Sequence, residues 1–127
     1  VDWAPGWMPE LVVSDSGVCE PECIFVTAPE FDSESNNSIW IVSKHDPDNC
    51  AVQMYKVAPG HTISKLQIAL EREGDNSTAA HISYEITAIG APGDEFMTEF
   101  TQEWYDAFMI DWEKAINHYL DTGSIIA

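Results

Sequence analysis

The sequence predicts an α+β domain in which a curved antiparallel sheet holds one long C-terminal helix. Short β-prone runs separated by turn residues fill the region from Cys23 to Ala88. Apolar residues then recur at helical spacing from about Asp94 to Asp121. Strands followed by a single terminal helix are typical of a sheet that packs one face against that helix.

Clusters of Ser, Asn, Asp, Pro and Gly divide the first part of the chain into six predicted strands. We expect these strands at about 10–14, 22–28, 38–44, 50–57, 62–72 and 79–89. The connections between them are short, so consecutive strands are predicted to pair as an antiparallel meander.

Even-numbered residues in these strands are predicted to form the inner face of the sheet, because residues two apart share a face. The turn positions predict that Trp40 lies between Val26 and Met54, and that Leu66 lies between Met54 and Tyr84. On this interpretation the inner face carries no His, Asp or Glu. Its thirteen predicted members are apolar or aromatic: Ile24, Val26, Trp40, Val42, Val52, Met54, Leu66, Ile68, Leu70, Ile82, Tyr84, Ile86 and Ala88.

The outer face is predicted to be mostly polar, with one apolar patch. Phe25 is expected beside Ile41, and Ile39 beside Tyr55. A contiguous apolar set on a surface marks contact with another molecule. We therefore predict a homodimer that forms through Phe25, Ile39, Ile41 and Tyr55.

The terminal helix carries a broad aromatic stripe, with acidic residues on its other side. Acidic residues near Asp94 favour its start, and Gly123 favours its end. The stripe consists of Met97, Phe100, Trp104, Tyr105, Phe108, Trp112, Ala115, Ile116 and Tyr119. Trp112 and Tyr119 are expected to be core residues, whereas the first half of the stripe carries enough ring volume to border a cavity.

The strand register and the helical stripe converge on one predicted cavity. Its expected lining is Trp40, Met54, Leu66, Tyr84, Phe100, Trp104 and Phe108. The phenol of Tyr84 is the main polar group there, and it would offer a hydrogen bond to a ligand. These residues predict a binding site for a small apolar or aromatic ligand.

Composition limits the classes of partner. The 127 residues are expected to form one domain, 1–127. With 22 acidic and 5 basic residues, the formal charge of −17 should repel nucleic acids and anionic membranes. No apolar run approaches the roughly 20 residues that a membrane helix needs. We therefore expect a cytoplasmic protein with no membrane insertion.

Motifs for cofactors or metals are missing from the sequence. There is no glycine-rich phosphate loop, no dinucleotide-binding fingerprint and no His-Glu-x-x-His motif. Cys19 and Cys23 are four positions apart, but no second close pair of Cys or His completes a tetrahedral site. We expect no metal and no cofactor, and the odd number of cysteines fits a reducing compartment.

Several stretches resemble bacterial START-like proteins of the SRPBCC superfamily. Near the end of the chain these are Ile-Ser-Tyr-Glu-Ile-Thr-Ala-Ile-Gly from Ile82, Phe-Thr-Gln-Glu-Trp from Phe100, and Trp-Glu-Lys-Ala-Ile-Asn-His-Tyr-Leu-Asp-Thr-Gly from Trp112 to Gly123. Earlier similarities are Pro5-Gly6-Trp7, Ser16-Gly17-Val18, and Trp40-Ile41-Val42 followed by Asp46-Pro47. The resemblance spans essentially the whole chain.

The resemblance implies a helix-grip fold and a choice of functions. Similar proteins include carriers of hydrophobic ligands, polyketide cyclases and dehydratases, and co-chaperones that act on a heat-shock chaperone. It also implies an N-terminal strand and two short helices that this sequence lacks, so we expect a domain truncated at its N-terminus. A ligand carrier or sensor is the leading hypothesis, with a cyclase-like or dehydratase-like enzyme and a chaperone-interacting module as alternatives.

Overall fold

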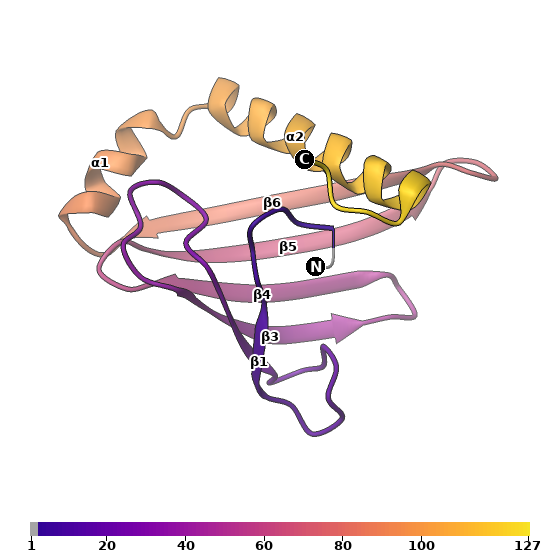
Figure 1. The fold of residues 1–127 in the computed structure, drawn as a ribbon, viewed down its shortest axis with the longest axis horizontal. Coiled ribbons are helices and arrows are strands. Elements are labelled where there is room, and N and C mark those ends of the chain that lie inside the picture. The colour runs from indigo at the N-terminus through magenta and orange to yellow at the C-terminus, as the bar shows by residue number, and fades with distance from the viewer. Residues whose placement is uncertain (1–2) are drawn as a thin grey trace.

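A computed structural model describes residues 3–127 and confirms the α+β architecture, with six antiparallel strands followed by two helices (Figure 1). Each strand pairs with its neighbour in sequence, in the order β1-β2-β3-β4-β5-β6, which is the predicted meander. The strands are β1 (Glu10–Val13), β2 (Ile24–Thr27), β3 (Ser38–Asp46), β4 (Ala51–Ala58), β5 (Thr62–Arg72) and β6 (Thr78–Ala88). The helices are α1 (Ala91–Glu99) and α2 (Gln102–Thr122).

The register is as predicted from β4 to β6 and shifted between β3 and β4. Met54 lies opposite Leu66, and Leu66 lies opposite Tyr84, as expected. Trp40 lies opposite Lys56, so its predicted pairing with Met54 is wrong. The turn is the cause, since Asp46 lies opposite Ala51 and the hairpin is centred further along the chain than predicted; a bulge in β3 between Val42 and Lys44 then takes one position off this offset. The shift at Trp40 is two positions, and the predicted inner face of β3 and β4 is therefore preserved.

In β2 the predicted face is wrong. Phe25, not Val26, lies opposite Trp40, and the rings of Phe25 and Trp40 stack with centroids 5.8 Å apart. Ile24, Phe25 and Val26 are consecutive apolar residues, so alternation alone could not choose between the two faces. The choice is made by tertiary contacts, since the Trp40 indole also donates a 3.0 Å hydrogen bond to the hydroxyl of Thr27.

The apolar patch on the outer face loses Phe25, which is buried on the inner face. The cross-strand pairs within the patch also differ from the predicted pairs Phe25–Ile41 and Ile39–Tyr55. Ile41 lies opposite Ile24 and Tyr55, while Ile39 lies opposite Val57. Ile39, Ile41 and Tyr55 remain 37% exposed, and Ile63 at 40% continues the row that contains Ile39. We call Ile39, Ile41, Tyr55 and Ile63 the outer-face patch.

The single long helix that the sequence predicts is divided into α1 and α2. Phe100 ends α1, and Thr101 takes extended backbone geometry. The hydroxyl of Thr101 accepts a 3.2 Å hydrogen bond from the Trp104 amide, so Thr101 acts as the N-cap of α2. α2 ends at Gly123, whose φ of 72° is favourable for glycine.

The helices are fixed to one edge of the sheet. In α1, a Cβ at Gly93 would lie 1.9 Å from the carbonyl oxygen of His61, so only glycine allows this close approach. In α2, the phenol of Tyr105 donates a 2.8 Å hydrogen bond to the carbonyl of Ile82 in β6. Trp112 is buried as predicted, whereas Tyr119 is only half-buried. None of the helices in residues 3–127 is both long and apolar enough to cross a membrane.

Two irregular segments contribute aromatic rings to the core between the sheet and the helices. In the N-terminal segment, residues 3–9, Trp7 packs on Trp40 at 5.0 Å and Trp3 packs on Trp112 at 5.2 Å between ring centroids. In the β2–β3 loop, residues 28–37, Phe31 packs on Phe96 of α1 at 4.7 Å. Side chains from these segments therefore occupy part of the space that the sequence assigns to the predicted cavity.

Candidate functional site

A buried ionic cluster lies against the inner face of the sheet. Its acidic side chains come from the β2–β3 loop and not from the strands, and its lysine is an inner-face residue that the predicted set of thirteen lacks. We call Lys56, Glu30 and Glu34 the ionic cluster. The Nζ atom of Lys56 lies 2.7 Å from Glu30 Oε2 and 2.7 Å from Glu34 Oε1. The three side chains are 1%, 6% and 1% exposed, respectively. Such burial is tolerated by charged groups only when they are paired.

The geometry of the strands and the loop explains how the cluster forms. Lys56 occupies an even, inward-facing position of β4, between Met54 and Ala58, while the two glutamates come from the β2–β3 loop. Glu34 also accepts hydrogen bonds from the Glu30 amide at 3.0 Å and from the Ser38 hydroxyl at 3.2 Å. The loop is thus folded around its own acidic side chains, which meet the lysine on the sheet.

Lys56 has no free capacity for an additional anion. Its ammonium group bonds to both glutamates and also lies 4.5 Å from the centroid of the Phe31 ring. The contact with Phe31 is a cation–π interaction. All the directions from which an acidic ligand could approach Lys56 are therefore taken by the chain itself.

Two buried oxygen atoms have no hydrogen-bond partner among residues 3–127: Oε1 of Glu30 and the hydroxyl of Tyr84. Burial raises the pKa of Glu30 above its ordinary value, and this effect exceeds the opposing attraction of Lys56. Burial also raises the pKa of Tyr84 well above its usual value, and the charge of Glu30 adds to that shift. Unpaired buried oxygens are rare in native proteins and call for a partner.

A groove of about 370 Å³ runs between the N-terminal segment, the β2–β3 loop and α2, and Glu30 forms part of its wall. Its aromatic lining consists of Trp3, Trp7, Phe108 and Trp112, and the remaining lining consists of Ala4, Pro5, Gly6, Pro29, Asp111, Lys114, Ala115 and Ile126. This volume lies within the roughly 300–1,000 Å³ typical of small-molecule sites. An aromatic groove with one buried acidic side chain, that of Glu30, in its wall is the candidate functional site.

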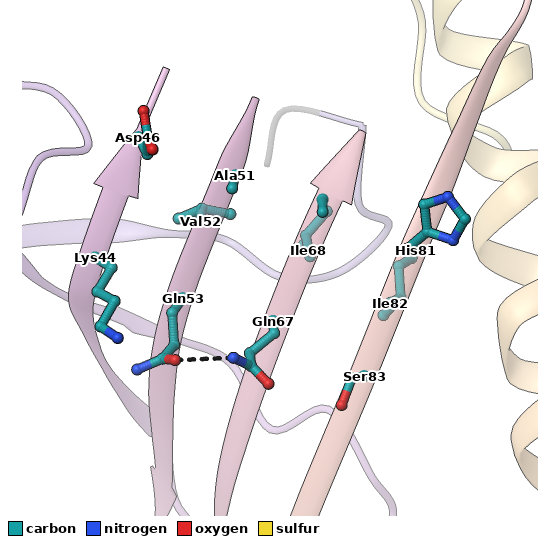
Figure 2. A pocket seen from close by; sticks show the side chains of 11 residues that line it. Lys44, Asp46, Ala51, Val52, Gln53, Gln67, Ile68, His81, Ile82 and Ser83 are labelled. Atoms are coloured by element: carbon teal, nitrogen blue, oxygen red, sulfur yellow. Dashed lines mark hydrogen bonds between the residues drawn. The ribbon is translucent and has the colours of Figure 1, made fainter. Parts of the chain in front are cut away.

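A second hollow, of about 380 Å³, lies on the outer face of the sheet. Figure 2 shows Lys44, Gln53, Gln67 and Ser83, which stand in one row across β3 to β6. Gln53 accepts a 3.0 Å hydrogen bond from Gln67 and donates one of 2.9 Å to Ser43. The buried amide of Gln53 is thus already paired within the chain, so none of the described residues that line this hollow has a buried unpaired polar side chain like that of Glu30.

His61 fastens the β2–β3 loop to the sheet. Its Nε2 atom lies 2.7 Å from the Ser33 hydroxyl, and its Nδ1 atom lies 3.0 Å from the Thr62 hydroxyl. Burial lowers the pKa of His61, so the ring is neutral at pH 7. A serine bonded to a neutral histidine resembles part of a catalytic triad. In a triad the second ring nitrogen of the histidine would contact a carboxylate, whereas here it contacts the hydroxyl of Thr62. In addition, neither Ser33 nor His61 lines the groove. We interpret this chain of contacts as structural.

The seven residues predicted to line the cavity are divided between core and groove. Trp40, Met54 and Leu66 are buried in one cluster, and Tyr84 and Phe108 pack against it. Phe100 and Trp104 pack on each other at 5.4 Å and on Phe96 of α1. Of the seven, Phe108 lines the groove. Ligand contact remains a prediction for all seven.

Sequence reasoning missed several residues of the groove and of the ionic cluster: Trp3, Trp7, Glu30, Glu34 and Lys56. Lys56 carried a usable signal, because a lysine at an inward position of an alternating strand requires buried acidic partners. The acidic residues of the β2–β3 loop gave no such signal, since acidic loops are usually solvated. Comparison with models of known protein families, with curated proteins and with solved structures gives no match.

Proposed function

We propose that this protein binds a small apolar or aromatic molecule in the groove between its N-terminal segment, its β2–β3 loop and its C-terminal helix, as a carrier or sensor with a START-like helix-grip fold. The observation that carries the proposal is the groove lined by Trp3, Trp7, Phe108 and Trp112. An open antiparallel sheet followed by helices is consistent with the helix-grip arrangement. The odd number of cysteines supports the cytoplasmic location that we propose with it.

Binding of prodan, an uncharged naphthalene dye whose emission rises and shifts to shorter wavelength in apolar surroundings, tests the proposal. We expect saturable binding with a stoichiometry of one. Ala115→Leu places three extra carbon atoms in the groove, because Ala115 lines it and is 4% exposed. The variant should weaken binding by about tenfold or more, which corresponds to about 1.4 kcal/mol.

Ala107→Leu is the matched control, since Ala107 is exposed on the same helix. It should leave prodan binding unchanged. Circular dichroism and thermal unfolding establish that both variants are folded. Absence of saturable binding to the parent protein, or equal affinity of the two folded variants, would contradict the proposed site.

An acid–base enzyme acting on an aromatic or polyketide substrate is the second candidate, and Glu30 is the observation that favours it. Cyclase and dehydratase chemistry requires a proton donor or acceptor in the pocket, with a pKa near the working pH. Glu30 lines the groove, and burial raises its pKa. Turnover of a poly-β-ketone substrate that is lost in Glu30→Gln would favour the enzyme, whereas binding without turnover would favour the carrier.

A further inference from the structure

The wall of the groove carries an excess of negative charge. The ionic cluster contains two carboxylates and one ammonium, so it has one net negative charge when both glutamates are ionised. On the opposite wall, Asp111 and Lys114 are exposed and contribute one charge of each sign. A cation in the groove would therefore be attracted, and an anion would be repelled.

One of the two unpaired oxygens belongs to a residue of the groove wall, and the other lies behind the aromatic rings of that wall. Glu30 is part of the groove wall, and its Oε1 has no partner among the described residues. The Tyr84 hydroxyl is unpaired as well, and its ring lies 6.2 Å from that of Phe108 and 6.1 Å from that of Trp112, both groove residues. An ionised carboxylate only accepts hydrogen bonds, so it favours a ligand with N–H groups.

The aromatic lining also favours a cation. The Trp3 ring meets Trp112 edge-on, with centroids 5.2 Å apart, and Phe108 meets Trp112 at 5.7 Å. The faces of aromatic rings carry negative potential and attract organic cations, most strongly when the cation has lost water. Cages of aromatic rings are an arrangement that proteins use to recognise quaternary ammonium ligands.

From these observations we infer that the ligand is an organic amine, cationic at neutral pH, with an apolar or aromatic body. Its ammonium group pairs with Glu30 Oε1, and its body lies against the rings of Trp3, Phe108 and Trp112. An acidic ligand is disfavoured because Lys56, the cation of the cluster, is already occupied by Glu30, Glu34 and the Phe31 ring. This inference rests on the proposed function and specifies the chemical class of the ligand.

Three ligands with one ring system test the inference by isothermal titration calorimetry: 2-(1-naphthyl)ethylamine, 2-(1-naphthyl)ethanol and 1-naphthylacetate. The amine should bind about tenfold or more tightly than the alcohol, because it adds a charge-assisted hydrogen bond and a cation–π contact. The carboxylate should bind most weakly. Titration in buffers of different ionisation enthalpy should show proton release on amine binding, as the ammonium stabilises the ionised form of Glu30.

Glu30→Gln keeps the size of the side chain and removes its charge. In this variant the amine and the alcohol should bind within about twofold of each other. Glu113→Gln is the control for overall charge, since Glu113 is exposed on α2, and it should retain the preference for the amine. Should Glu30→Gln fail to fold, the ligand series and the proton release in the parent protein still decide the question.

The outcomes separate this inference from the proposed function. If prodan and the alcohol bind but the amine gains no advantage, or if Glu30→Gln keeps the preference for the amine, the inference is wrong and the groove binds neutral ligands. If neither prodan nor any of the three naphthyl compounds binds, the proposed function itself is wrong.

Discussion

Replacing Lys56 with methionine should destabilise the fold strongly. Methionine keeps an unbranched apolar chain, so the main change is loss of the ammonium that contacts Glu30 and Glu34 at 2.7 Å. Both glutamate side chains are at least 94% buried and would be left without a counter-charge. Breaking a buried ion pair in this way costs about 3–5 kcal/mol, a large part of the roughly 5–15 kcal/mol that stabilises a typical domain.

Urea denaturation followed by tryptophan fluorescence measures this loss. The control is Lys65→Met, which removes an exposed contact of 3.7 Å between Lys65 and Glu85. Exposed pairs contribute about 0–1 kcal/mol, so the control should stay near the parent protein. Replacing Glu30 and Glu34 with glutamine in addition to Lys56→Met should recover much of the stability, because the buried charges are then absent.

The stability lost in Lys56→Met should also depend on pH, and the burial of the glutamates determines the direction of that dependence. Burial raises the pKa of Glu30 even beside Lys56, and loss of the ammonium removes the attraction that opposes this rise, so in the variant the folded-state pKa of Glu30 lies further above the unfolded value of 4.5. Stability associated with such groups is present below about pH 4.5 and is lost as pH rises through the folded-state pKa. The variant should therefore be less destabilised at pH 5 than at pH 8. A loss under about 1 kcal/mol at pH 8, equal to that of Lys65→Met, would refute the reasoning.

Two further predictions concern α2 and the outer face of the sheet. Trp112→Ala should lower the free energy of unfolding, measured by urea denaturation, by about 3–5 kcal/mol, because Trp112 is 8% exposed and packs on three other aromatic rings, those of Trp3, Phe108 and Tyr84. The control Ile110→Ala, at a position that is 51% exposed, should lower it by less than about 1 kcal/mol. A cost below about 1 kcal/mol for Trp112→Ala with loss of prodan binding would make Trp112 a ligand contact and not a core residue. The outer-face patch should support a homodimer that tightens with salt, because screening weakens the repulsion between chains of charge −17. Sedimentation velocity should show Ile41→Asp as a monomer and the control Ser83→Asp, at an exposed outer-face position opposite Gln67, as a dimer. A parent protein that is monomeric at both low and high salt would refute the dimer.

The meander was predictable because its signals are local. Turn residues mark the ends of the strands, and strict alternation in β5 and β6 places Leu66 and Tyr84 on the same face and opposite each other, as observed. Local signals failed in β2, where Ile24, Phe25 and Val26 are all apolar and either face could have been the inner one. The division of the helix at Thr101 was missed for a related reason, since the apolar stripe continues through the break.

The candidate site was less predictable because it depends on contacts between distant segments. Phe108 was expected in it from its place on the helical stripe, and Tyr84 was expected to be the main polar group beside it. Trp3 and Trp7 precede the sheet and enter the groove only because the N-terminal segment lies against Trp40 and Trp112. Neither residue has a periodic neighbour that would have predicted its position.

The sequence by itself determined the α+β class, the antiparallel order of the six strands and the position of the aromatic stripe on the terminal helix, because turn propensity and hydrophobic periodicity act over a few residues. Only the tertiary structure decided what meets the inner face. Lys56 is brought to Glu30 and Glu34 across 26 and 22 positions of sequence, and its bond to Oε2 of Glu30 leaves Oε1 of that carboxylate without a partner among the described residues. Desolvation and pairing depend on the surroundings of each group in space, and no pattern along the chain records them.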